Sequence, residues 1–202
     1  MIIPQALTAL IIAFLFLPDG PPWPTFSVDP LIHNIQDVDY NPKKDTGHYL
    51  SQKILYRPVR ELRHELESFL DQELKHRGEA HITVITPPEY RDILSEFMTM
   101  EEIRHLAHAF NLQSSPFHIA CLGRGTYAEL ETYFLLVESP RLLQFRQKIQ
   151  TIYEQRGGVV GGFVAEHYFP HITIGFTQRD LHESDGVRKD PRTCWARVVL
   201  KP

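Results

Sequence analysis

Two short segments of the chain carry the same pair of polar residues at the same spacing. The first is His81-Ile82-Thr83 and the second is His171-Ile172-Thr173. An imidazole with its ordinary pKa of about 6.5 can give or take a proton near neutral pH. A threonine hydroxyl can donate a hydrogen bond to an oxyanion as negative charge develops. Two such pairs suit acid–base catalysis on an anionic substrate.

The residues around each motif predict a β-strand. Both "AHITVIT" and "PHITIGF" are rich in β-branched residues, which favour strands. Residues i and i+2 of a strand point to the same face, so His81 and Thr83 share a polar face while Ile82 points to the core. The second motif follows the same rule. Gly175, next on its polar face, is expected to leave room for a ligand.

A single His-x-Ser/Thr triplet carries little weight. The chain has 11 histidines, enough for about one such triplet by chance. His182-Glu183-Ser184 is such a triplet, and it lies in a charged segment without strand character. Two triplets that each lie in a β-branched strand after a long amphipathic helix argue against coincidence.

Hydrophobic periodicity predicts an α+β domain. We expect strands at 48–56, 80–86, 116–125, 131–139, 170–176 and 194–200. We expect helices at 58–77, 88–98, 99–110 and 140–158, the third capped by Thr99 with Glu102 at its third position. Each half of the chain runs strand, helix, strand, which indicates two related lobes.

The N-terminal residues differ in composition from the rest. Residues 18–45 are rich in Pro, Asp and Asn and are expected to form an irregular linker, so we divide the chain into 1–45 and a domain at 46–202. Residues 6–17 are apolar, with the length of a signal-peptide core and too few residues for a membrane span. A signal sequence, an anchor and an apolar arm packed on the domain all remain open. Location in the cytoplasm or the secretory pathway therefore stays open, and membrane contact requires an uncleaved anchor.

The composition is that of an ordinary soluble domain. The 202 residues are 43% hydrophobic and 23% charged, with a formal net charge of −4. This balance offers no broad basic surface for duplex DNA or long RNA, and we expect a monomer. The two cysteines, Cys121 and Cys194, fit a disulfide or two buried thiols, and both readings stay open.

The paired motifs, in "AHITVITPPEY" and "FPHITIGFT", resemble those of the 2H phosphoesterase superfamily of cyclic-phosphodiesterase-like proteins. The resemblance covers roughly residues 48–200 and is closest to the eukaryotic Swiss-army-knife RNA repair-like branch. It implies two pseudo-symmetric lobes, each an antiparallel β-sheet with flanking helices, around a central cleft. It also implies that His81 and His171 catalyse, that Thr83 and Thr173 bind phosphate, and that 2′,3′-cyclic phosphates of nucleotides or RNA ends are opened without a metal or cofactor. Thr86-Pro87-Pro88 departs from other branches, which have an aromatic there.

Three further residues are candidates for substrate binding. Tyr168 and Tyr90 flank the motifs and could stack on a base, although core packing explains such rings equally well. Arg124 lies between two glycines, where a turn would present its guanidinium to a phosphate.

Two other classes of function remain as alternatives. A non-catalytic module could hold a nucleotide or RNA end in the same cleft. A metal-dependent hydrolase is a poorer fit, since Pro170 breaks the helix that would bring His167 and His171 together. We therefore expect no metal site.

Overall fold

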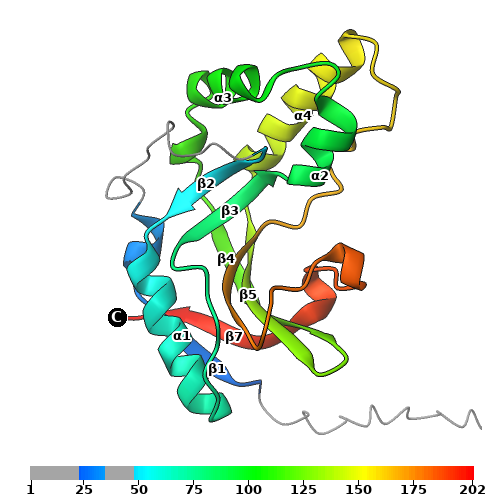
Figure 1. The fold of residues 1–202 in the computed structure, drawn as a ribbon. Coiled ribbons are helices and arrows are strands. Elements are labelled where there is room, and N and C mark those ends of the chain that lie inside the picture. The colour runs from blue at the N-terminus through cyan, green and yellow to red at the C-terminus, as the bar shows by residue number, and fades with distance from the viewer. Residues whose placement is uncertain (1–22, 35–47) are drawn as a thin grey trace, which may run out of the picture.

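Two β-sheets and the helices that flank them make up the computed structural model, which describes residues 23–34 and 48–202 (Figure 1). The larger sheet has the strand order β1-β7-β4-β5-β6, and the smaller sheet pairs β2 with β3. The predicted α+β class is confirmed. The strands are β1 (Thr25–Val28), β2 (Leu50–Ile54), β3 (Ala80–Ile85), β4 (His118–Tyr127), β5 (Leu130–Glu138), β6 (His171–Phe176) and β7 (Cys194–Leu200). The α-helices are α1 (Tyr56–Leu70), α2 (Pro87–Glu89), α3 (Met100–Ala109) and α4 (Pro140–Gln155).

The larger sheet is antiparallel except at one edge. There β1 pairs in parallel with β7, with Thr25 opposite Arg197. The prediction of an irregular linker over 18–45 is therefore wrong for these four residues. Phe26 and Val28 are buried in the core, but the prolines on both sides of β1 made the segment look like a linker. Its partner comes from the other end of the chain, so the pairing leaves no local signal.

Helix α1 is amphipathic, as predicted, although its bounds differ. It begins at Tyr56, ahead of Pro58, and ends at Leu70, where the next residue, Asp71, has a left-handed φ of 51°. Its buried stripe includes Val59, Leu62 and Leu66, and the helix packs against β1 and β6. Each turn of the stripe removes apolar surface from water, which is the main favourable contribution to folding.

The segment after α1 pairs with the end of β6. Lys75 and Phe176 exchange both backbone hydrogen bonds, at 2.8 and 2.9 Å. A Cβ added to Gly175 would lie 2.9 Å from Leu74 Cβ and 3.2 Å from the Lys75 carbonyl oxygen. The expectation that Gly175 leaves room for a ligand is therefore wrong. The glycine instead permits the close approach of this neighbouring backbone.

Helices α2, α3 and α4 gather at one end of the molecule, beyond the small sheet (Figure 1). α2 runs into a π-helical turn, Tyr90–Leu94, so the single helix predicted for 88–98 is broken and shortened. α3 begins as predicted, with the Thr99 hydroxyl accepting a hydrogen bond from the Glu102 backbone at 3.2 Å. None of the helices in the described ranges is long and apolar enough to cross a membrane, and residues 6–17 lie outside those ranges.

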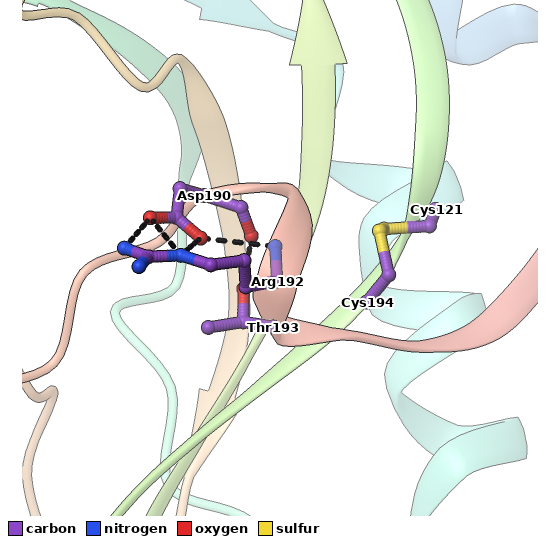
Figure 2. Close-up of a disulfide and its surroundings, with 5 residues drawn as sticks. All are labelled: Cys121, Asp190, Arg192, Thr193 and Cys194. Atoms are coloured by element: carbon purple, nitrogen blue, oxygen red, sulfur yellow. Dashed lines mark hydrogen bonds and ion pairs between the residues drawn. A yellow bond between two sulfur atoms is a disulfide. The ribbon is translucent and has the colours of Figure 1, made fainter.

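The two cysteines form a disulfide between β4 and β7. Cys121 and Cys194 are joined with their Cα atoms 5.7 Å apart, which decides between the two readings left open by the sequence. Beside them, the Arg192 guanidinium donates hydrogen bonds to the carboxylate of Asp190, and the Thr193 hydroxyl donates to the Asp190 carbonyl at 2.6 Å (Figure 2). The residues that lead into β7 are thus fixed next to the disulfide.

Candidate active site

The strands that carry the two motifs lie side by side. β3 belongs to the small sheet and β6 is an edge of the large one, and the two strands contact each other. The four polar motif residues are each partly exposed: His81, Thr83, His171 and Thr173. The intervening Ile82 and Ile172 are completely buried. The predicted alternation is present on both strands, and the catalytic roles stay a prediction.

The ring of His171 is held by the backbone just before it. Its Nδ1 lies 2.8 Å from the carbonyl oxygen of Phe169. Because a carbonyl can only accept, Nδ1 must carry the proton and Nε2 keeps its lone pair. The edge of this ring meets the ring of Phe134, with centroids 5.8 Å apart. The tautomer of neutral His171 is thereby fixed.

The surroundings of His171 favour its neutral form. Burial of the ring, the positive charge of Lys189 and that of His81 oppose protonation, and together they lower the pKa of His171 to about 3. The Phe169 carbonyl and the carboxylate of Asp180 act in the opposite direction but do not outweigh them. His171 is therefore a neutral hydrogen-bond acceptor at neutral pH. The influence of His81 also shows that the two imidazoles lie within electrostatic reach of each other.

His81 has an acidic neighbour. Its Nδ1 is 3.4 Å from Oε1 of Glu79, two residues earlier on the same chain segment. The ring of Tyr49 lies 6.0 Å from the imidazole, and the His81 side chain is 13% exposed. Glu79 thus offers an anionic partner whenever His81 carries a proton.

The two motif threonines differ in their hydrogen bonding. Thr173 donates its hydroxyl proton to Oδ2 of Asp180 at 3.3 Å, a long hydrogen bond. The hydroxyl of Thr83 makes no side-chain hydrogen bond with the part of the chain that the structure describes. Thr83 is thus ready to donate to a ligand, whereas Thr173 must exchange one acceptor for another.

Asp180 is the centre of a buried polar cluster beside the second motif. Its carboxylate accepts hydrogen bonds from Thr132 and Lys189, both at 2.8 Å, and from Arg77 at 2.9 Å, besides Thr173. Burial disfavours the charged carboxylate, but Lys189 and Thr132 outweigh that penalty and lower the pKa of Asp180 to about 2. The cluster ties β5 and β6 to the segment that leads into β3.

Asp180 and Lys189 were missed in the sequence. Both lie in a run of charged residues that has the composition of a solvated loop. The segment folds back onto the Phe134 face of the large sheet, which leaves only 7% of Asp180 and 5% of Lys189 exposed. This burial could not be predicted from the local sequence, because it depends on contacts with β5 and β6.

Arg146 of α4 connects the two motif strands from behind. Its guanidinium donates to the Val84 carbonyl at 2.8 Å and to the Ala165 carbonyl at 2.9 Å. It also forms an ion pair with Glu89, which in turn accepts from the Thr86 backbone. Arg146 is fully buried. It therefore joins the end of β3 to the segment that enters β6.

The two tyrosine candidates lie near the motifs in packing positions. The ring of Tyr168 is 4.7 Å from the Arg146 guanidinium, and its hydroxyl is buried without a hydrogen-bond partner among the described residues. Burial raises the pKa of the Tyr168 phenol. Tyr90 stacks on His48 at 5.8 Å and accepts a hydrogen bond from the Met100 backbone at 3.0 Å. Base stacking by either ring stays a prediction.

Arg124 is not in a turn, which corrects the sequence-based prediction. It lies inside β4, and the hairpin turn follows at Ala128, whose φ is 50°. Its guanidinium pairs with Glu131 and lies 5.9 Å from the Trp195 ring. The flanking glycines suggested a turn, but they belong inside the strand, because a Cβ added to Gly123 or Gly125 would lie 2.4 Å from the side chain of Phe134 or Val187.

In the described ranges no group of three or more His, Cys, Asp or Glu side chains is arranged to hold a metal ion. His167, one of the two histidines weighed as a ligand, instead pairs with Glu183 at 3.3 Å.

The comparisons with known proteins agree with the geometry. A family model described as Swiss Army Knife, 2H phosphoesterase domain, matches residues 48–182, more than half of the chain. The matched residues include both motifs, the Arg146 connection and Asp180. Searches of curated proteins and of solved structures gave no match.

Proposed function

Because the chain belongs to the Swiss Army Knife family of 2H phosphoesterase domains, we propose that it opens 2′,3′-cyclic phosphates of nucleotides or RNA ends without a metal. At the level of the family it is a phosphoesterase, a hydrolase of phosphodiester bonds. The net charge of −4 favours a small or single-ended nucleic-acid substrate over a duplex.

The observation that supports this proposal best is the asymmetry of the two imidazoles. His171 is neutral, with its tautomer fixed by the Phe169 carbonyl and its Nε2 lone pair without a hydrogen-bond partner among the described residues. His81 lies on the adjoining strand with its Nδ1 3.4 Å from Glu79, which pairs with the ring when the ring is protonated. Acid–base catalysis needs one group of each kind on either side of the reacting phosphorus. We therefore assign His171 as the general base and His81 as the general acid.

The reaction then runs as follows. Nε2 of His171 takes a proton from water while the water oxygen forms a new bond to phosphorus. The bond from phosphorus to one ribose oxygen breaks, and that oxygen receives a proton from His81. One water is consumed, a phosphate monoester is left on one ribose oxygen, and proton exchange with solvent restores both rings.

The two threonines would bind the non-bridging phosphate oxygens. Thr83 donates directly, since its hydroxyl has no acceptor among the described side chains. The Thr173 hydroxyl would rotate from Asp180 to the phosphate. This rotation costs little free energy because the hydrogen bond that it breaks is long, at 3.3 Å. Loss of one such donor to a developing oxyanion costs about 100-fold or more in rate in other enzymes.

The test is turnover of 2′,3′-cyclic nucleotides and of short RNAs with a cyclic-phosphate end, with and without EDTA. The variants are His81→Ala and His171→Ala, with His105→Ala on the exposed surface of α3 as the matched control. Chromatography of the products distinguishes 2′- from 3′-phosphates.

We expect turnover by the parent protein in EDTA, no change in His105→Ala, and a loss of at least about 100-fold in each motif variant. Binding of the cyclic nucleotide without turnover would favour a non-catalytic binding module instead. Activity that EDTA abolishes and an added divalent cation restores would favour a metal-dependent hydrolase.

A further inference from the structure

A buried lysine lies beside the second motif. Only 5% of Lys189 is exposed, and its Nζ donates to Oδ1 of Asp180 at 2.8 Å. The ammonium is 5.4 Å from the centroid of the Phe134 ring, and the same ring meets the edge of His171. Burial lowers the pKa of Lys189, whereas the carboxylate of Asp180 favours its charged form. The Lys189 side chain and the His171 imidazole thus lie against the same aromatic ring.

The ion pair does little for stability by itself. Desolvation of two charges offsets most of their attraction, so a buried pair is often replaced by apolar residues without loss. Its effect on a neighbouring titratable group is larger, because charges interact more strongly away from water. The neighbour in this structure is His171.

The charged groups that face His171 come from two elements. Lys189 and Asp180 belong to the segment after β6, and His81 belongs to β3. Lys189 opposes protonation of His171 more strongly than Asp180 favours it. Arg77 also pairs with Asp180 at 2.9 Å and takes up part of its negative charge. The net influence of the cluster is therefore to disfavour a second positive charge on the imidazole.

We propose that Lys189, anchored by Asp180, is a positioning residue that acts together with burial of the ring to hold His171 in the neutral form required of a general base. This inference rests on the proposed function for the role of His171, but its physical content is independent of turnover. Asp180 has two contacts at the site, since its carboxylate accepts one hydrogen bond from Lys189 and another from the Thr173 hydroxyl.

The test measures protonation of His171 directly. Protein labelled with ¹⁵N-histidine is titrated by NMR, and His171→Ala identifies the His171 signals. Lys189→Met removes the ammonium with little change in side-chain length. Lys201→Met is the matched control, because it removes the same charge from a residue that pairs with Glu61 on α1. Asp180→Asn/Lys189→Met removes both members of the pair and serves if Lys189→Met does not fold.

In the parent protein we expect the Nδ1–H tautomer to persist as the pH is lowered well below 6. In Lys189→Met the midpoint pH of the His171 titration rises. In the double variant this midpoint also rises, but by less. In Lys189→Met the value of kcat/KM at pH 5, divided by its value at pH 7.5, falls several-fold, up to about tenfold, because more of His171 is protonated at pH 5. Lys201→Met leaves both the titration and the ratio unchanged.

A His171 titration that is the same in Lys189→Met and the parent protein overturns the proposal and leaves Lys189 a purely structural residue. If the parent protein lacks phosphodiesterase activity, the proposed function fails, and the NMR titration still decides the role of Lys189. The two failures are therefore distinguishable.

Discussion

The guanidinium of Arg146 meets the carboxylate of Glu89 through both terminal nitrogens, at 2.7 and 3.2 Å. This contact lies where β3 ends and where the chain turns toward β6. Glu89 also closes the capping box of α2 with Thr86. One buried side chain thus connects α4, the first motif strand and the approach to the second.

Arg146→Met is expected to lower the free energy of unfolding by about 3 kcal/mol or more, since it removes the cation that pairs with Glu89 and the donor to the Val84 and Ala165 carbonyls. Urea denaturation measures the loss. Arg60→Met on the exposed side of α1 is the control and should change stability by less than about 0.5 kcal/mol. Equal stability of the two variants would contradict a structural role for Arg146.

The disulfide should contribute substantially to stability. Cys121 and Cys194 are 73 residues apart, and a closed loop of that length is worth about 4 kcal/mol on the chain-entropy model. We expect dithiothreitol to lower the midpoint of thermal unfolding of the parent protein. Cys121→Ala/Cys194→Ala should unfold at the lower temperature and should not respond to the reductant. A parent protein that is indifferent to dithiothreitol would argue against the bond.

Stability should fall with acid over a defined window. The pKa of His171 is about 3 in the folded protein but about 6.5 when unfolded, so between these values the unfolded chain binds the extra proton. Asp180, whose folded pKa is about 2, adds a loss below its unfolded value of about 3.9. Urea denaturation from pH 7.5 to 4.5 should show decreasing stability in the parent protein. The slope should be shallower in His171→Gln, and parallel curves would refute this linkage.

Tyr168→Phe separates packing from recognition. The Tyr168 hydroxyl is buried and has no partner in the described residues, so its removal should raise stability by about 1 kcal/mol. The ring that would stack on a base is retained, so KM for a cyclic nucleotide should not change. Tyr168→Leu should raise KM if the ring stacks on the base, as predicted. A KM that is the same in all three proteins would assign Tyr168 to packing alone.

The sequence determined much of this protein because the relevant signals are local. Alternation along 80–86 and 170–176 located both motif strands and the faces of their side chains, since a strand has a fixed period of two. The amphipathic stripes of α1 and α4 and the Thr99 cap were equally readable. The resemblance carried by the two motifs gave the family, which the match over residues 48–182 confirms.

Tertiary structure decided what depends on distant partners. β1 was not predicted, since prolines lie on both sides of it and it forms a strand only by pairing with the distant β7. Cys121 and Cys194 could be assigned to a bond only once β4 and β7 were neighbours. The segment that carries Lys189 and Asp180 has the composition of a solvated loop, but in the folded protein it packs over Phe134 and buries both side chains. Burial and charge act through space, so the neutral state of His171 is a property of the fold that its motif alone does not reveal.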